Sequence, residues 1–178
     1  NHQHRYLQPQ GKLDTLVTGL GIADLLAQSA AVYPSFIHGD PHPRNIGIKK
    51  DDEIVLFDFE AEYCGLGAAQ IDLAKLYTHR AVALPVPEQV RLVHDYMRQR
   101  GITDETFMVG FHAAALYITF AHVSYVAGHV GTKYTREEAT LSLQRDKAIL
   151  KNHATQLYGK ITALKLVETT QQEFGLTG

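Results

Sequence analysis

The sequence has a single cysteine, Cys64, and its lysines and arginines are not gathered into a cluster. One cysteine excludes a disulfide within the chain and favours a reducing compartment. With a formal net charge of −2, the chain also lacks the basic field that marks partners such as nucleic acid or an anionic membrane surface. We therefore expect a cytoplasmic protein that binds neither of these partners.

A second absence is the lack of Asp, Glu, Lys and Arg over residues 106–132. This span is long enough to cross a bilayer. It contains three histidines and several hydroxyl-bearing side chains, and it lacks the basic flanks and the dense leucine and isoleucine content that favour insertion. We therefore predict a buried core helix rather than a membrane-spanning helix.

The rest of the composition is that of a globular protein, with 45% hydrophobic and 20% charged residues. A chain of 178 residues is long enough for one domain, or for one large lobe of a bigger one. We expect a frayed N-terminal segment over residues 1–11 and a single, mostly helical unit over residues 12–178. This unit is expected to contain one small β-hairpin.

Proline, glycine and capping residues predict where the helices begin and end. Pro34 ends the first helical stretch, which is either one broken helix or two short ones. Gly101 ends the helix that starts near Pro87, and Thr135 opens a capping box. The predicted helices cover approximately residues 13–33, 68–83, 87–101, 103–128, 135–158 and 161–174.

The β-hairpin is predicted from two short apolar runs, residues 45–49 and 54–57, which are joined by a charged turn. In an antiparallel pair with a short turn, the first residue of one strand lies opposite the last residue of the other. The side chains of Asn45 and Asp58 are therefore expected to lie close enough to bind one ion.

The chemistry of the chain is expected in residues 36–60, where Asn45 follows Asp40 by five residues and Asp58 follows Asn45 by thirteen. Phosphoryl transfer of the kinase type needs a carboxylate that receives the hydroxyl proton and oxygen ligands that hold magnesium. Each of the three residues taken alone could simply be a turn former. As a set they suit this chemistry, because short strands are predicted to carry them.

This segment resembles the aminoglycoside phosphotransferase and choline kinase family, a branch of the protein-kinase-like fold. The family signature is His-Gly-Asp, four residues, Asn, and then Asp after the next strand; here it is His38-Gly39-Asp40, Asn45 and Asp58. The resemblance implies that Asp40 is the catalytic base, that Asn45 and Asp58 bind Mg²⁺, and that ATP or GTP is the co-substrate. It also implies that the chain is the C-terminal lobe of the kinase-like α+β fold.

Three more residues are assigned supporting roles. The resemblance implies that Asp72 braces the catalytic loop through its backbone, whereas the residues alone leave a solvent-facing helix position or a partner of the helix dipole equally open. His38 either orients the backbone of Asp40 or takes part in proton transfer, and we favour the first because one base suffices. Glu60 gives the motif Asp-Phe-Glu, similar to the choline kinase branch, and is either a charge near the metal or an exposed loop carboxylate.

The residues with which a kinase-like protein holds its nucleotide have no counterpart ahead of His38. They are a strand-borne lysine, a helix glutamate and a glycine-containing loop, whereas Lys12 is the only lysine in that part of the chain. We therefore expect a small-molecule kinase whose N-terminal lobe is missing from this chain, and which is inactive or weak without it. The alternative is a non-catalytic binding module of the same fold.

A metal-dependent hydrolase is a further alternative, because Asp40 and His42 have the Asp-x-His spacing of dinuclear metal sites. It would need a second motif, for which Asn152-His153 is the candidate.

The sequence does not identify the acceptor. The resemblance places the acceptor pocket among the helices after Asp58, in the segments that contain Tyr77, Tyr96, His112, Tyr117 and His122. Because no acid lies between Glu105 and Glu137, a neutral or sugar-like hydroxyl compound is the expectation.

Overall fold

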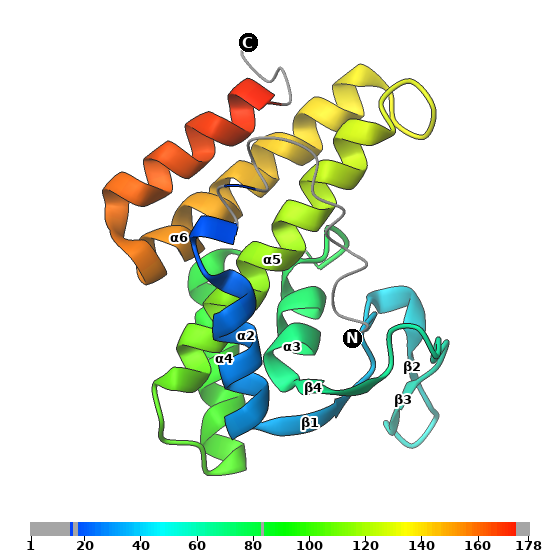
Figure 1. The fold of residues 1–178 in the computed structure, drawn as a ribbon. Coiled ribbons are helices and arrows are strands. Elements are labelled where there is room, and N and C mark those ends of the chain that lie inside the picture. The colour runs from blue at the N-terminus through cyan, green and yellow to red at the C-terminus, as the bar shows by residue number, and fades with distance from the viewer. Residues whose placement is uncertain (1–14, 16–17, 83, 174–178) are drawn as a thin grey trace.

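The chain folds into a helical body with two short β-ribbons at one edge (Figure 1). The computed structural model describes residue 15, residues 18–82 and residues 84–173. The predicted N-terminal segment, Lys12 and most of the start of the first predicted helix lie outside these residues. The helices are α2 (Ile22–Val32), η1 (Pro43–Asn45), α3 (Ala69–Thr78), α4 (Val86–Arg100), α5 (Thr106–Gly128) and α6 (Arg136–Glu173), and the strands are β1 (Pro34–Ile37), β2 (Ile46–Ile48), β3 (Ile54–Leu56) and β4 (Gly65–Ala68).

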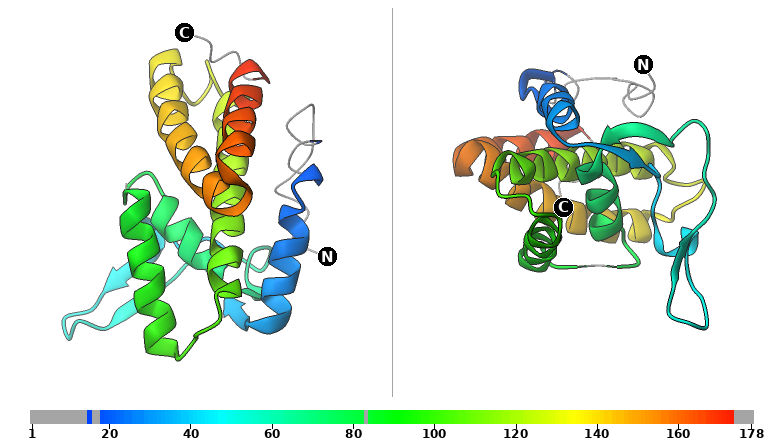
Figure 2. Two further views of the ribbon diagram at one scale, coloured as in Figure 1. Left: turned by 90° about the vertical axis from the view of Figure 1, so that its left-hand side faces the viewer. Right: turned by 90° about the horizontal axis from the view of Figure 1, so that it is seen from below.

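Helix α5 forms the centre of the helical body. Its side chains Phe107, Phe111, Leu116 and Phe120 are buried, and it contacts α2, α3 and α6. Figure 2 shows these helices packed along α5 from different sides. By length and composition α5 could cross a membrane, but 67% of its most apolar window is buried inside the protein. The prediction of a buried core helix is therefore confirmed.

A glycine in α5 lets α2 and α3 approach it closely. A β-carbon at Gly110 would overlap the side chain of Ser29 on α2. At the same place, Nε2 of Gln70 on α3 donates a hydrogen bond of 2.6 Å to Oγ of Ser29. Because β1 follows α2 and β4 precedes α3, this three-helix contact also sets the position of the strands that carry the site.

Helix α6 consists of two helical segments that are separated at Gly159, where φ is 81° and ψ is 168°. Glycine adopts this conformation readily because it has no β-carbon. Figure 1 shows the two segments running side by side in opposite directions. The predicted break between residues 158 and 161 is therefore confirmed.

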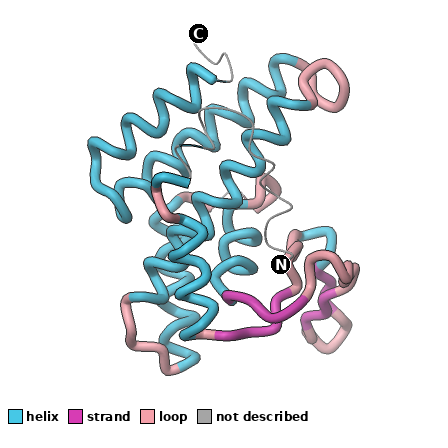
Figure 3. Tube along the Cα trace, viewed as in Figure 1, coloured by secondary structure: helices cyan, strands magenta, loops and turns pink. Residues whose placement is uncertain are grey.

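The β-structure differs from the prediction in the number of ribbons. Strands β2 and β3 form the predicted hairpin, in the register Ile46↔Leu56 to Ile48↔Ile54. A second antiparallel ribbon pairs β1 with β4, and Figure 3 shows both ribbons at the same edge of the molecule. The expectation of one hairpin was incomplete, because β4 is a Gly-Leu-Gly-Ala segment without the β-branched and aromatic residues that mark a strand.

Helix α3 ends at Thr78, five residues before the predicted end at residue 83. Oγ1 of Thr78 donates to the carbonyl oxygen of Ala74 at 2.7 Å. The guanidinium group of Arg145 on α6 donates to the carbonyl oxygen of Thr78. A cation at the last carbonyl groups of a helix stabilises its C-terminus, so Arg145 of α6 stabilises the end of α3.

Candidate active site

Asp72 in the first turn of α3 holds the loop that follows β1. Its Oδ2 accepts the backbone N–H of His38, and its Oδ1 accepts the backbone N–H of Gly39, each at 2.8 Å. Burial raises the pKa of Asp72, although the two N–H groups act to lower it. These two hydrogen bonds are the geometry that the family resemblance implied for Asp72, and its contribution to activity stays a prediction.

The loop that follows β1 needs glycine at position 39. Gly39 has a φ of 80°, and a β-carbon there would overlap the carbonyl group of Tyr63. Cys64, which follows Tyr63 in the chain, donates from Sγ to the carbonyl oxygen of His38 at 3.2 Å. Burial, and to a lesser degree nearby carboxylates, raise the pKa of the Cys64 thiol, which keeps it protonated as a hydrogen-bond donor.

His38 connects the two segments of the site. It is 2% exposed, its Nδ1 accepts the backbone N–H of Asp40 at 3.3 Å, and its Nε2 donates to the carbonyl oxygen of Phe57 at 2.9 Å. The ring of Phe59 lies against it, with 4.4 Å between ring centroids. Because both ring nitrogens are engaged with the backbone, the geometry favours the orienting role of His38 over a role in proton transfer.

Asn45 and Asp58 lie at the same end of the hairpin. The side-chain Nδ2 of Asn45 donates to the carbonyl oxygen of Asp40 at 3.1 Å, and the carbonyl oxygen of Asn45 accepts the N–H of Phe57 at 3.1 Å. Asp58 follows Phe57 with a φ of 65°, a left-handed conformation that aspartate tolerates better than most residues. The hairpin therefore places Asn45 beside the residue that precedes Asp58.

The oxygen donors of Asn45 and Asp58 suit magnesium. Mg²⁺ is usually bound by one or two carboxylates together with substrate phosphates, and this pair offers one carboxylate and one carboxamide oxygen. Among the described residues, no group of three or more His, Cys, Asp or Glu side chains could hold a metal ion. An ion bound by such a pair would take its remaining ligands from a phosphate-bearing molecule and water.

The carboxylate of Asp40 is contacted by two basic side chains. Nζ of Lys75 lies 3.0 Å from Oδ1, and Nε2 of His42 lies 3.5 Å from Oδ2. Lys75 is three residues after Asp72, on the same face of α3, so one helix holds both the backbone and the carboxylate of the loop. Sequence reasoning missed Lys75, for which this spacing was the only signal.

Glu60 lies exposed in the turn after Asp58. Its carbonyl oxygen accepts the N–H groups of Tyr63 and Cys64 at 2.9 and 3.0 Å. The contacts that the structure shows for Glu60 are therefore those of a main-chain turn, and a charge near the metal stays a prediction.

The second motif of the hydrolase alternative lies in the core. His153 is fully buried, and its Nδ1 lies 2.8 Å from Nδ1 of His112 on α5. Within the residues that the structure describes, no second metal motif is brought to the loop of Asp40 and His42.

Acid is expected to destabilise the protein through this histidine pair. Burial lowers the pKa of His112 to about 4 and that of His153 to about 3, whereas an unfolded histidine titrates near 6.5. Because the unfolded chain binds more protons between these values, stability falls as the pH drops from 6.5 towards 4. For one histidine whose pKa is 4 when folded, the loss of unfolding free energy between pH 7 and pH 4.5 is about 2 kcal/mol.

Urea unfolding at several pH values between 7 and 4.5 measures this loss. The double variant His112→Leu/His153→Leu removes both titrating rings and should show a flatter dependence of unfolding free energy on pH. An equally steep dependence in the double variant would contradict the role of the pair.

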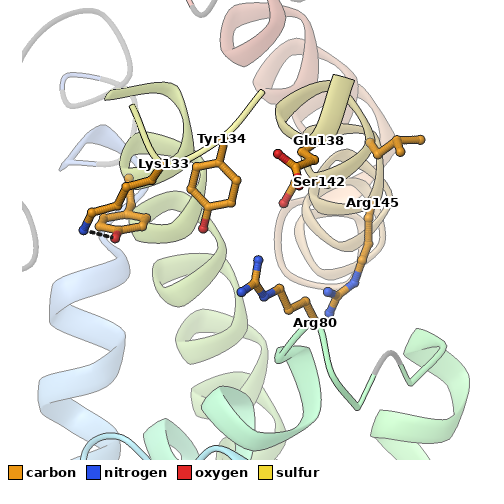
Figure 4. Close-up of a pocket in the computed structure, with 8 residues that line it drawn as sticks. Arg80, Lys133, Tyr134, Glu138, Ser142 and Arg145 are labelled. Carbon is orange, nitrogen blue, oxygen red and sulfur yellow. Dashed lines mark hydrogen bonds between the residues drawn. The ribbon is translucent and has the colours of Figure 1, made fainter. Parts of the chain in front are cut away.

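The helix residues expected near the acceptor mostly serve packing. Tyr77, Tyr96 and Tyr117 pack against the core cluster, His112 belongs to the buried pair, and Nδ1 of His122 lies 2.8 Å from Oδ2 of Asp146. A pocket beyond the end of α3 is lined by none of these five residues (Figure 4).

A comparison with protein families agrees with the signature around Asp40. The model of the phosphotransferase enzyme family matches residues 1–117, a range that contains both ribbons and ends within α5. The same chain gives no significant match to a curated protein or to a solved structure.

Proposed function

Because the chain belongs to the phosphotransferase enzyme family, we propose that it transfers a phosphoryl group from ATP or GTP to a hydroxyl group of a small molecule. The position of Asp40 is the observation that supports this most. Its loop is held at the backbone by Asp72 and His38, and its carbonyl oxygen accepts the amide of Asn45. Its carboxylate remains 30% exposed, as a base that meets a substrate must be.

In the proposed reaction, the acceptor hydroxyl donates its proton to the carboxylate of Asp40 while its oxygen bonds to the γ-phosphorus. The bond between the γ-phosphorus and the β–γ bridging oxygen breaks, and the nucleoside diphosphate leaves. Asn45 and Asp58 would hold Mg²⁺, which neutralises charge on the phosphates. His38 and Asp72 keep the Asp40 loop in one conformation, so little reorganisation is needed during the transfer.

The proposal includes a nucleotide-binding lobe of the same protein that covers the two ribbons. Phe36 and Leu66 lie opposite each other in the β1–β4 pair, and they are 63% and 84% exposed. The β2–β3 hairpin also exposes large apolar side chains, those of Ile48, Ile54 and Leu56. Exposed apolar surface of this kind is typical of an interface. A cytoplasmic location is also part of the proposal, and the single cysteine supports it.

An assay of the full-length protein with ATP or GTP, magnesium and a panel of hydroxyl compounds tests this function. We expect release of nucleoside diphosphate that depends on both the acceptor and the metal, with a phosphomonoester product that is visible by phosphorus NMR. If nucleotide binds but no sugar, amino alcohol, hydroxy acid or sugar phosphate is phosphorylated, the protein is instead a non-catalytic binding module.

A further inference from the structure

A pocket of about 660 Å³ lies where the end of α3 meets the α5–α6 connection and the start of α6 (Figure 4). Three of its lining side chains are cationic, and one is a carboxylate: Arg80, Lys133, Arg145 and Glu138. Hydroxyl groups of two tyrosines and one serine, Tyr125, Tyr134 and Ser142, add hydrogen-bonding capacity. The pocket is more open than enclosed, so a ligand bound there would keep part of its surface in solvent.

The carboxylate of this pocket is already engaged in holding the start of α6. Oε2 of Glu138 accepts the backbone N–H of Thr135 at 2.8 Å and its hydroxyl group at 2.9 Å, as in a capping box. With three cationic side chains and one carboxylate, the lining carries an excess of positive charge, although the chain as a whole has a net charge of −2.

Two guanidinium groups of the pocket lie close enough to repel each other. Burial lowers the pKa of Arg145, the nearby carboxylate of Asp146 acts to raise it, and the charge of Arg80 acts to a smaller degree to lower it. Figure 4 shows both guanidinium groups on the same side of the pocket. Arginine binds carboxylate and phosphate groups through paired N–H donors, so an anion between these two side chains would relieve their repulsion.

A series of contacts runs from Asp40 to the residue that precedes Arg80. Nε2 of His42 lies 3.5 Å from Oδ2 of Asp40, and the rings of His42 and His79 stack with 5.3 Å between their centroids. Arg80 follows His79 directly in the chain. Burial is the main cause that lowers the pKa of His79 to about 4, and the surrounding cationic groups, including Lys75, lower it further.

We infer that this pocket binds an anionic group of the acceptor, and that the acceptor is a hydroxylated compound with a carboxylate or a phosphate, such as a sugar acid or a sugar phosphate. The inference rests on the proposed function. It differs from the neutral acceptor expected from the sequence, where only the charge of α5 was considered. Seven of the eight lining residues lie beyond residue 117, where the family match ends.

The Arg80→Gln variant of the full-length protein tests the inference, with Arg91→Gln as its matched control. Arg80 and Arg91 are both exposed, and Arg91 lies on α4 in ion pairs with Glu88 and Asp95. Arg145 is less suitable, because it also contacts the end of α3.

Calorimetry without nucleotide would compare gluconate, glucose 6-phosphate and glucose as ligands. We expect one of the two anions to bind, and Arg80→Gln to weaken it roughly tenfold, as for the loss of a charge-assisted hydrogen bond. Glucose should bind weakly to all three proteins, and Arg91→Gln should behave as the wild type. The preferred anion distinguishes a carboxylate site from a phosphate site.

Kinetics separate the inference from the function on which it rests. With the preferred anionic acceptor, Arg80→Gln should raise KM roughly tenfold and leave kcat almost unchanged, because Arg80 holds a part of the acceptor that does not react. If the wild type phosphorylates only neutral or cationic acceptors, or if Arg80→Gln binds every anion as the wild type does, the inference is wrong and the function stands. Anion binding that depends on Arg80, without transfer to any acceptor, would support the anion site and contradict the function.

Discussion

The Asp40→Asn variant is expected to lower kcat by about 10²- to 10⁴-fold, the range that a general base contributes. Asparagine has nearly the same size as aspartate and keeps one acceptor oxygen, but it cannot receive the hydroxyl proton. Binding of nucleotide and acceptor should change far less, because the carboxylate acts in proton transfer rather than in holding either substrate. The loss should therefore appear in kcat more than in KM.

Stability should change little in this variant. The pair of Asp40 with Lys75 is partly exposed, and partly exposed ion pairs contribute at most about 1 kcal/mol. The matched control is Asp95→Asn, which removes a carboxylate that pairs with Arg91 and Arg98 on α4. Thermal unfolding followed by circular dichroism compares the stability of both variants with that of the wild type, and steady-state kinetics compare their kcat and KM. An undiminished rate in Asp40→Asn would mean that the assigned mechanism is wrong.

The second large effect is expected for Asp58→Asn, which should weaken the binding of Mg²⁺ or Mn²⁺ in the presence of nucleotide by roughly 100-fold. The substitution removes a charged oxygen ligand. Asparagine tolerates the left-handed conformation of this position as aspartate does, so the turn after β3 should keep its shape. Activity should recover in part at high metal concentration, because the nucleotide phosphates supply other ligands.

A manganese titration followed by electron paramagnetic resonance measures this change directly. The control is Asp51→Asn, in which the lost carboxylate is exposed in the turn of the same hairpin. Metal binding by Asp58→Asn that equals that of the wild type would remove Asp58 from the site. The Asn45→Ala variant would then show whether the carboxamide is a ligand.

The parts of the site that could be predicted from the sequence lie within one short stretch of chain. The amide of Asn45 reaches the carbonyl oxygen of Asp40 five residues away, and the hairpin returns Asp58 to the same end. A short charged turn between two apolar runs allows few other arrangements. The register of β2 and β3 therefore agreed with the prediction, and so did the break at Gly159.

Other parts of the site depend on contacts between distant segments. Asp72 binds backbone groups of His38 and Gly39, which precede it by 34 and 33 residues, and only the family resemblance suggested this contact. The ion pair of Lys75 with Asp40 had no comparable signal. The β1–β4 ribbon was also missed, because the pairing of a glycine-containing strand appears only when α2 and α3 have packed on α5.

The sequence alone determined the helical composition of the protein, its central apolar helix and the spacing of Asp40, Asn45 and Asp58, because periodicity and turn chemistry act over a few residues. The tertiary structure alone brought Arg145 to the last carbonyl group of α3, across 67 residues of chain. It also decided which cations meet in the pocket beyond α3. Such contacts depend on how α3 and α6 pack on α5, and no local pattern encodes that packing.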